Sequence, residues 1–148
     1  MKDYVFLSGP VKHTDDGEGW RNEVLSFARD ADWYLRIFDP CEYFDYSWSD
    51  EFQKSDRQIR EYYFQAIKKA NVVLCNLNET EFSVGTGMEV QYAVDHDIPV
   101  IGWGTEVVYN WVKDSCTVVF DTLEDALEYI TVYYDLDFRE EEFVRESN

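Results

Sequence analysis

The chain has 148 residues, of which 45% are hydrophobic and 18% aromatic, so it is long and apolar enough to bury the core of one domain. Its 31 acidic and 13 basic residues give a formal net charge of −18, which excludes the basic surface that nucleic acids and anionic lipids require. Three cysteines without paired spacing, and no apolar run of membrane-spanning length, predict a cytoplasmic protein in a reducing compartment.

Apolar runs bounded by turn residues predict five strands, and helix-period patterns predict five helices that follow them. In chain order the expected elements are strand 4–8, helix 20–31, strand 34–38, helix 51–70, strand 71–77, helix 84–95, strand 98–103, a short helix 106–112, strand 117–120 and helix 122–134. We expect one domain over residues 1–148, with a charge-dense acidic tail at 135–148.

Strict alternation of strands and helices predicts an α/β fold with a doubly wound, mostly parallel sheet and helices on both faces. Right-handed crossovers then place the carboxyl ends of the first three strands on one edge. The turns that follow these strands contain Gly9-Pro10, Asp39-Pro40 and the segment 83–89. Three loops therefore converge on one cleft, at the place where open α/β sheets bind ligands.

The segment 83–93 brings a glycine-rich turn and one carboxylate, Glu89, to the first turn of a helix. A carboxylate held there can serve as a nucleophile. The spacing from Thr86 to Glu89 is also that of a capping box, in which Glu89 only closes its own helix, and Gly85 and Gly87 then merely permit positive φ. The segment is neither the dinucleotide fingerprint nor a phosphate loop.

Five segments carry a resemblance to a known family: 5–10, 38–40, 70–74, 85–93 and 98–100. Their most specific part is Gly87-Met88-Glu89 followed by Tyr92-Ala93. Over residues 1–105 the chain resembles the nucleoside 2-deoxyribosyltransferases. The resemblance implies a flavodoxin-like fold, a homo-oligomer of two or more subunits, and no metal or organic cofactor.

In the chemistry that this resemblance implies, Glu89 is the nucleophile. It attacks C1′ of a 2′-deoxynucleoside as the base leaves, and a second base or water then attacks the sugar ester, so that two displacements retain configuration. Gly9, Asp39, Ser83, Gly85 and Gly87 are expected to shape the sugar site. Helix N-terminal amides near Glu89 are expected to lower its pKa and keep it ionised at neutral pH.

The chain departs from the pattern of the family it resembles, in which an acid that helps handle the proton of the leaving base stands eight positions before an aspartate that opens the third strand. Tyr63 and Asn71 stand at these positions. Tyr63 is a candidate for this role, although its ordinary pKa near 10 is unfavourable and the alternative is a core tyrosine. Asp39, Asp45 and Asp56 are the other candidates for the catalytic acid.

Ser83 is a second informative departure. Serine at this position resembles the branch of the family that hydrolyses deoxynucleoside 5′-monophosphates, whereas the transferases often have aspartate there. Phosphate donors would then come from Ser8, Lys12, His13 or Arg21. The alternative is that Ser83 simply caps the helix that follows it.

Aromatic side chains near the strand ends are candidates for stacking on the base, and they comprise Phe6, Trp20, Tyr43, Phe44 and Trp48. Asn110 is a candidate for reaching the site of a neighbouring subunit. The two histidines share no ligand spacing with each other or with the cysteines, so we expect no metal site. The expected substrate-binding residues are Phe6, Ser8, Gly9, Trp20, Asp45, Ser83, Gly85, Gly87 and Asn110.

The sequence therefore predicts an enzyme that transfers deoxyribose between bases, with a small-molecule substrate and with neither nucleic acid nor membrane as a partner. Three alternatives stay open. They are a 2′-deoxynucleoside 5′-monophosphate N-glycosidase, a catalytically silent nucleotide-binding relative, and an enzyme that attacks NAD-like glycosidic bonds.

Overall fold

The computed structural model describes residues 4–10, 19–40, 56–78, 83–105 and 110–135. Five parallel strands form one sheet in the order β2-β1-β3-β4-β5. The strands are β1 (Tyr4–Ser8), β2 (Arg36–Phe38), β3 (Val72–Asn76), β4 (Val100–Trp103) and β5 (Val118–Phe120). The predicted doubly wound α/β fold is thereby confirmed.

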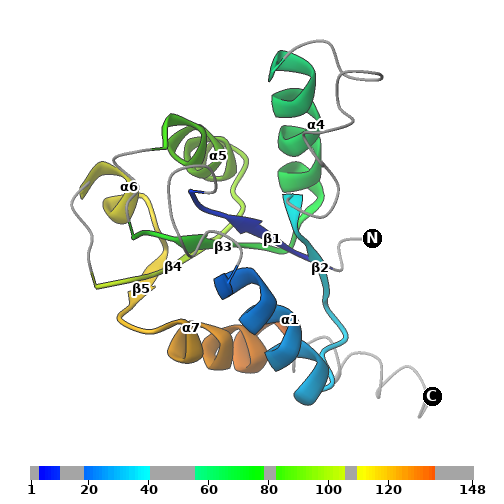
Figure 1. Ribbon diagram of the computed structural model, residues 1–148. Helices are drawn as coiled ribbons and strands as arrows, with labels where there is room; N and C mark the ends of the chain where they lie inside the picture. Colours follow the sequence, from blue (N-terminus) through cyan, green and yellow to red (C-terminus); the bar gives the residue numbers. More distant parts are fainter. Residues whose placement is uncertain (1–3, 11–18, 41–55, 79–82, 106–109, 136–148) are drawn as a thin grey trace.

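Helices cover both faces of the sheet (Figure 1). They are α1 (Gly19–Asp30), α4 (Asp56–Lys69), α5 (Val84–Asp95), α6 (Asn110–Asp114), α7 (Leu123–Ile130) and the π-helical turn η2 (Thr131–Asp135). One core cluster joins α1 and α7 to the sheet, and the other joins α4, α5 and α6 to the opposite face. No helix among the described segments is long and apolar enough to cross a membrane.

Successive side chains of β1 point alternately toward the helices on the two faces of the sheet. Val5 and Leu7 are fully buried in the cluster with α1 and α7, whereas Phe6 is fully buried in the cluster with α4 and α5. Because successive side chains of a strand point to opposite faces, Ser8 lies on the same face as Phe6. The last residue of β1 therefore presents a hydroxyl toward α5.

The observed elements follow the expected ones closely, and α5 has the predicted bounds of 84–95. Strand β2 begins at Arg36 instead of residue 34 because the N–H groups of Tyr34 and Leu35 both donate to Asp135 Oδ1, at 2.7 and 2.9 Å. Asp135, expected to open the acidic tail, is thus fully buried. Residues 51–55 of the long predicted helix, 106–109 of the short one and 136–148 of the tail lie outside the described residues.

Candidate active site

The turn that enters α5 is organised by Ser83. Its Oγ accepts the Thr86 N–H at 3.1 Å, and the two hydroxyl groups lie 2.7 Å apart. Ser83 is therefore the N-cap, as the capping alternative predicted. The predicted capping box of Thr86 and Glu89 is wrong, because α5 begins at Val84 and Glu89 lies in its second turn.

The Glu89 carboxyl group interacts with Ser8 and Cys75, which lie at the carboxyl ends of β1 and β3. Its Oε2 is buried, and it has no hydrogen-bond partner among the residues that the structure describes. Burial raises the pKa of Glu89 from 4.5 to about 7, against the opposing effects of the Arg21 guanidinium and the nearby Ser8 hydroxyl. Ser8 Oγ also lacks a hydrogen-bond partner in the described part, so it acts as a neighbouring dipole and not through a formed bond.

The expectation that helix amides lower the pKa of Glu89 is wrong for a physical reason. The influence of a helix terminus falls off within the first turn, and Glu89 lies beyond it. Removal of the carboxylate from water is then the dominant effect, and it favours the neutral form. Glu89 is therefore a carboxyl group that changes charge close to neutral pH.

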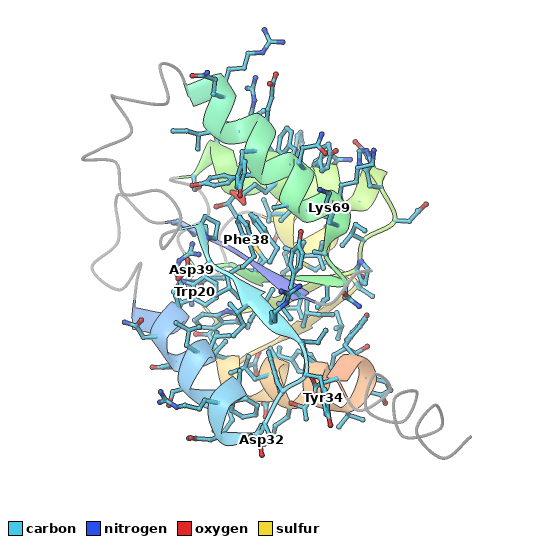
Figure 2. The ribbon with its side chains drawn as sticks, turned by 90° about the vertical axis from the view of Figure 1, so that its right-hand side faces the viewer. Trp20, Asp32, Tyr34, Phe38, Asp39 and Lys69 are labelled. Atoms are coloured by element: carbon cyan, nitrogen blue, oxygen red, sulfur yellow. The ribbon has the colours of Figure 1, made fainter. Side chains whose placement is uncertain are left out.

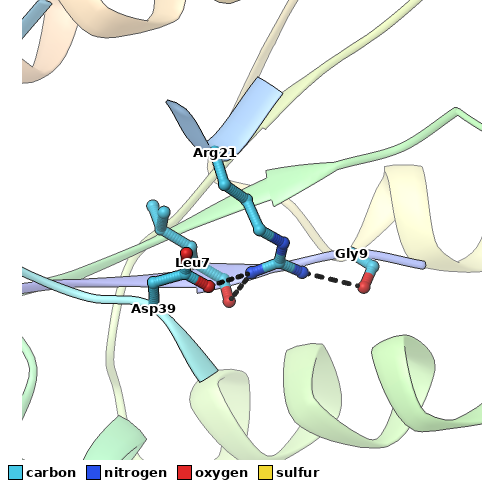
Figure 3. A network of polar contacts seen from close by, with 4 residues as sticks. All are labelled: Leu7, Gly9, Arg21 and Asp39. Carbon is cyan, nitrogen blue, oxygen red and sulfur yellow. Dashed lines mark hydrogen bonds and ion pairs between the residues drawn. The ribbon is translucent and has the colours of Figure 1, made fainter. Parts of the chain in front are cut away.

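A buried ion pair joins the carboxyl ends of β1 and β2, and Figure 3 shows its contacts. Arg21 Nη1 donates to Asp39 Oδ1 at 3.1 Å and to the Leu7 carbonyl at 3.2 Å, and Nη2 donates to the Gly9 carbonyl at 3.1 Å. The side chains of the pair are 2% and 5% exposed. The guanidinium also lies 4.7 Å from the centre of the Trp20 ring.

Gly9 is required by close packing at this edge. A Cβ added there would lie 3.0 Å from Asn76 Cβ and 3.2 Å from Trp20 Cζ2. Gly85 differs, because an added Cβ would meet nothing within 4 Å. Both Gly85 and Gly87 are helical, so the expectation that they permit positive φ is wrong.

The aromatic candidates that the structure describes are core residues. Phe6 is fully buried and stacks on Phe38 with ring centres 5.4 Å apart, and Tyr63 packs edge-on against it at 6.2 Å. Trp20 is 1% exposed, and its ring lies 5.8 Å from that of Trp103. Contacts of this kind match the core alternative for Tyr63, while the binding roles of Phe6 and Trp20 stay predictions.

The structure thus brings together Ser8, Gly9, Asp39 and Glu89 at one edge of the sheet, with Ser83 and Gly85 at the start of α5. Figure 2 shows Trp20 and Asp39 close together at this edge. Asn110 is exposed at the first residue of α6. The predicted residues Lys12, His13, Tyr43, Phe44, Asp45 and Trp48 lie outside the described segments, as does the side chain of Asp56.

Arg21 is the residue whose importance sequence reasoning underestimated, since it was considered only as a phosphate donor. A signal was present, because Arg21 shares the buried face of α1 with Val24 and Ala28 at helical spacing. A charged residue on a buried stripe requires a partner, and here the partner is Asp39. Among the residues described, no group of three or more His, Cys, Asp or Glu side chains is arranged to hold a metal ion.

The fold and this site define an α/β protein with a buried carboxyl group at the carboxyl edge of a parallel sheet, where such folds bind ligands. The sequence model of the family Nucleoside 2-deoxyribosyltransferase matches residues 5–126. The chain therefore belongs to the nucleoside 2-deoxyribosyltransferase family, as the resemblance predicted. A comparison with curated protein sequences found no match.

Several solved structures share the fold. A conserved protein from Enterococcus faecalis V583 has a TM-score of 0.71 at 14% identity, over 88% of this chain and 98% of that one. A 2-desoxiribosyltransferase from Leishmania mexicana has a TM-score of 0.65 at 19% identity, over 89% and 99%. The CMP N-glycosidase of Clostridium botulinum has a TM-score of 0.58 at 15% identity, over 88% and 100%.

Proposed function

We propose that this protein cleaves the N-glycosidic bond of a 2′-deoxynucleoside and transfers the deoxyribosyl group to an acceptor base, with Glu89 as the nucleophile. One observation carries the proposal. Glu89 Oε2 is buried near the carboxyl end of β1, and it has neither a hydrogen-bond partner nor a role in capping α5 within the described residues. A buried carboxyl oxygen without a hydrogen-bond partner is costly to retain unless the group has a function.

The reaction proceeds in two displacements. The ionised Glu89 carboxylate forms a bond to C1′ while the bond from C1′ to the base nitrogen breaks, and the base takes up a proton as it leaves. A nitrogen of the second base then attacks C1′, loses its proton and releases the Glu89 carboxylate unchanged. Each displacement inverts C1′, so the product retains the starting configuration.

The environment of Glu89 suits a nucleophile. Burial removes water from the carboxylate, which makes it more basic, and the nearby Arg21 guanidinium offsets part of that effect. The pKa of about 7 leaves a substantial ionised fraction at neutral pH. We assign the sugar pocket to Gly9, Ser83 and Gly85, since Gly85 leaves open space beside the first turn of α5.

Two observations favour a neutral nucleoside over a 5′-monophosphate. Arg21, the cation described at this edge, binds Asp39 and two main-chain carbonyls, and the Ser83 hydroxyl caps α5. The net charge of −18 further opposes the approach of a phosphate. The second candidate, hydrolysis of a deoxynucleoside 5′-monophosphate, is favoured by serine at position 83 and by the fold shared with the CMP N-glycosidase.

Proton handling is assigned to the edge that holds Asp39, with Tyr63 as the other candidate. Asp39 is closer to the chemistry, because it belongs to the same network as Gly9 and Arg21. Tyr63 belongs to the aromatic cluster around Phe6. We also propose that the protein works in the cytoplasm as a homo-oligomer in which Asn110, exposed on α6, reaches the neighbouring subunit's site.

The test supplies a 2′-deoxynucleoside or its 5′-monophosphate, each with and without an acceptor base, to wild-type protein and to Glu89→Gln. A new nucleoside that forms only with the acceptor, and only in wild-type protein, supports transfer. Free base released from the monophosphate without an acceptor would identify the hydrolase instead. Ligand-induced thermal stabilisation without any product would indicate a nucleotide-binding relative and overturn both enzymatic assignments.

A further inference from the structure

Arg21 reaches the site from the far side of the sheet. Helix α1 packs on the face that also carries α7, whereas Glu89 belongs to α5 on the opposite face. The guanidinium nevertheless extends over the carboxyl end of β1, where it contacts the carbonyls of Leu7 and Gly9 (Figure 3). The positive charge of Arg21 therefore lies at the carboxyl edge of the sheet, between the helices of the two faces.

We propose that Arg21 is a positioning residue for Glu89: its guanidinium fixes the main chain on both sides of Ser8 and, balanced by Asp39, supplies the positive charge beside which the Glu89 carboxylate ionises. This inference rests on the proposed role of Glu89. It assigns Arg21 a place in the reaction without contact to the substrate.

The main-chain contacts carry the first part of the inference. The two carbonyls that accept from Arg21 belong to the residues immediately before and after Ser8. Ser8 is 1% exposed, and its hydroxyl lies near the Glu89 carboxyl group. Loss of the guanidinium would release both carbonyls and allow Ser8 to turn away from Glu89.

The charges around Glu89 carry the second part. Of the described groups that act on its carboxyl group, Arg21 is the cation, and Ser8 on β1 contributes a dipole. On β3, Cys75 also faces Glu89, but burial raises the pKa of this thiol well above its ordinary value and keeps it neutral. Asp39 is the anion that partly cancels the charge of Arg21.

Within the described part of the chain, the other elements packed against α5 contribute no charge to this position. Helix α4 packs through Ala66 and Ile67 and adds the partly buried phenol of Tyr63. Helix α6 packs through Val112, while its charged residues Lys113 and Asp114 are exposed. Strand β4 adds the apolar Val100.

The proposed role of the ion pair between Arg21 and Asp39 predicts that two substitutions shift the pKa of Glu89 in opposite directions. Arg21→Met removes the cation and raises the pKa of Glu89, whereas Asp39→Asn leaves the cation unbalanced and lowers it. An opposite charge at close range shifts a carboxyl pKa by about 1–3 units, so we expect a rise of about 1 unit and a smaller fall. Arg21→Lys retains the charge but not the forked geometry, so the pKa stays near the wild-type value of about 7.

The experiment titrates Glu89 directly. Infrared difference spectra of protein labelled with carbon-13 glutamate, with Glu89→Gln as the blank, report its protonation without any need for turnover. Arg57→Met is the matched control, because Arg57 pairs with Glu61 on the exposed surface of α4. The acid limb of kcat/KM against pH is measured on the same variants and is expected to move with the infrared pKa.

A rise in Arg21→Met, a fall in Asp39→Asn and no change in Arg57→Met would support the inference. An unchanged Glu89 pKa in the folded Arg21→Met and Asp39→Asn variants would overturn it, even if their melting temperatures fall. If Arg21→Met does not fold, Asp39→Asn still decides the matter by the same titration. Failure of the proposed function is separately visible as full turnover in Glu89→Gln.

Discussion

Ser83 Oγ accepts the N–H of Thr86 at 3.1 Å, and this contact closes the first turn of α5 without Glu89. The carboxyl group three residues beyond Thr86 is therefore not needed to begin the helix. It lies instead in the second turn, buried against the carboxyl end of the sheet. The same stretch of sequence thus contains one residue for the cap and another that is available for chemistry.

The first prediction concerns the cap. Ser83→Ala removes the acceptor of the Thr86 N–H and should destabilise the protein by about 0.5–2 kcal/mol, whereas Ser83→Asp should restore most of the loss. Denaturant unfolding measures both. Thr122→Ala is the matched control, because Thr122 caps α7 through the Asp125 N–H at 3.2 Å and should lower stability without changing turnover. Equal stability of Ser83→Ala and wild-type protein would contradict the assignment.

The second prediction concerns stability against pH. The pKa of Glu89 rises on folding from 4.5 to about 7. Below pH 4.5 the group is neutral in both the folded and the unfolded protein and does not affect stability. Above pH 4.5 it ionises more easily in the unfolded protein, so the free energy of unfolding falls until the pH passes 7. A shift of one pKa unit corresponds to about 1.4 kcal/mol, so above pH 7 the free energy of unfolding of Glu89→Gln should be higher than that of wild-type protein by at most about 3 kcal/mol.

Unfolding at a series of pH values between 5 and 8 measures this difference. The gap between the unfolding free energies of Glu89→Gln and wild-type protein should widen up to about pH 7 and level off above it. The exposed Glu23 on α1 provides the control, since Glu23→Gln should show no such dependence. A gap that is constant over the whole range would mean that Glu89 is not desolvated in the folded protein.

The third prediction separates two glycines. Gly9→Ala drives a methyl group against Asn76 Cβ and the Trp20 ring, which β3 and α1 hold in place, and should cost about 1–3 kcal/mol. Gly85→Ala enters open space in a helix and should stabilise the protein by about 0.5–1 kcal/mol.

Activity adds a second readout to this comparison. If Gly85 lines the sugar pocket, the methyl group of Gly85→Ala should raise KM although the fold becomes more stable. Thermal unfolding and steady-state kinetics measure both effects. A stable Gly85→Ala variant with unchanged kinetics would remove Gly85 from the proposed pocket.

Much of the fold was predictable because it is encoded locally. Apolar runs such as 72–76 form strands, and the turn before 84 begins α5 at the predicted residue. The start of β2 was not predictable, because Asp135 competes for the N–H groups of Tyr34 and Leu35 from 100 residues away. Contacts of that range leave no periodic signal in a single sequence.

In the candidate site, too, some features are encoded locally and others depend on contacts between distant parts of the chain. The position of Glu89 follows from its motif, but its charge state follows from burial by segments distant in the chain. Ser83 and Thr86 both have cap-forming side chains, so the sequence alone did not decide which one begins α5. Arg21 was readable as a buried charge, although its partner Asp39 became evident only from the pairing of β1 with β2.

The central claim is that the Glu89 carboxylate forms a bond to the sugar. The most direct measurement mixes wild-type protein with a 2′-deoxynucleoside in the absence of an acceptor, quenches with acid and locates any adduct by peptide mass spectrometry. A deoxyribosyl group on Glu89, which disappears on addition of an acceptor base, is the predicted result. Transfer to the acceptor by Glu89→Ala at the wild-type rate would contradict the account.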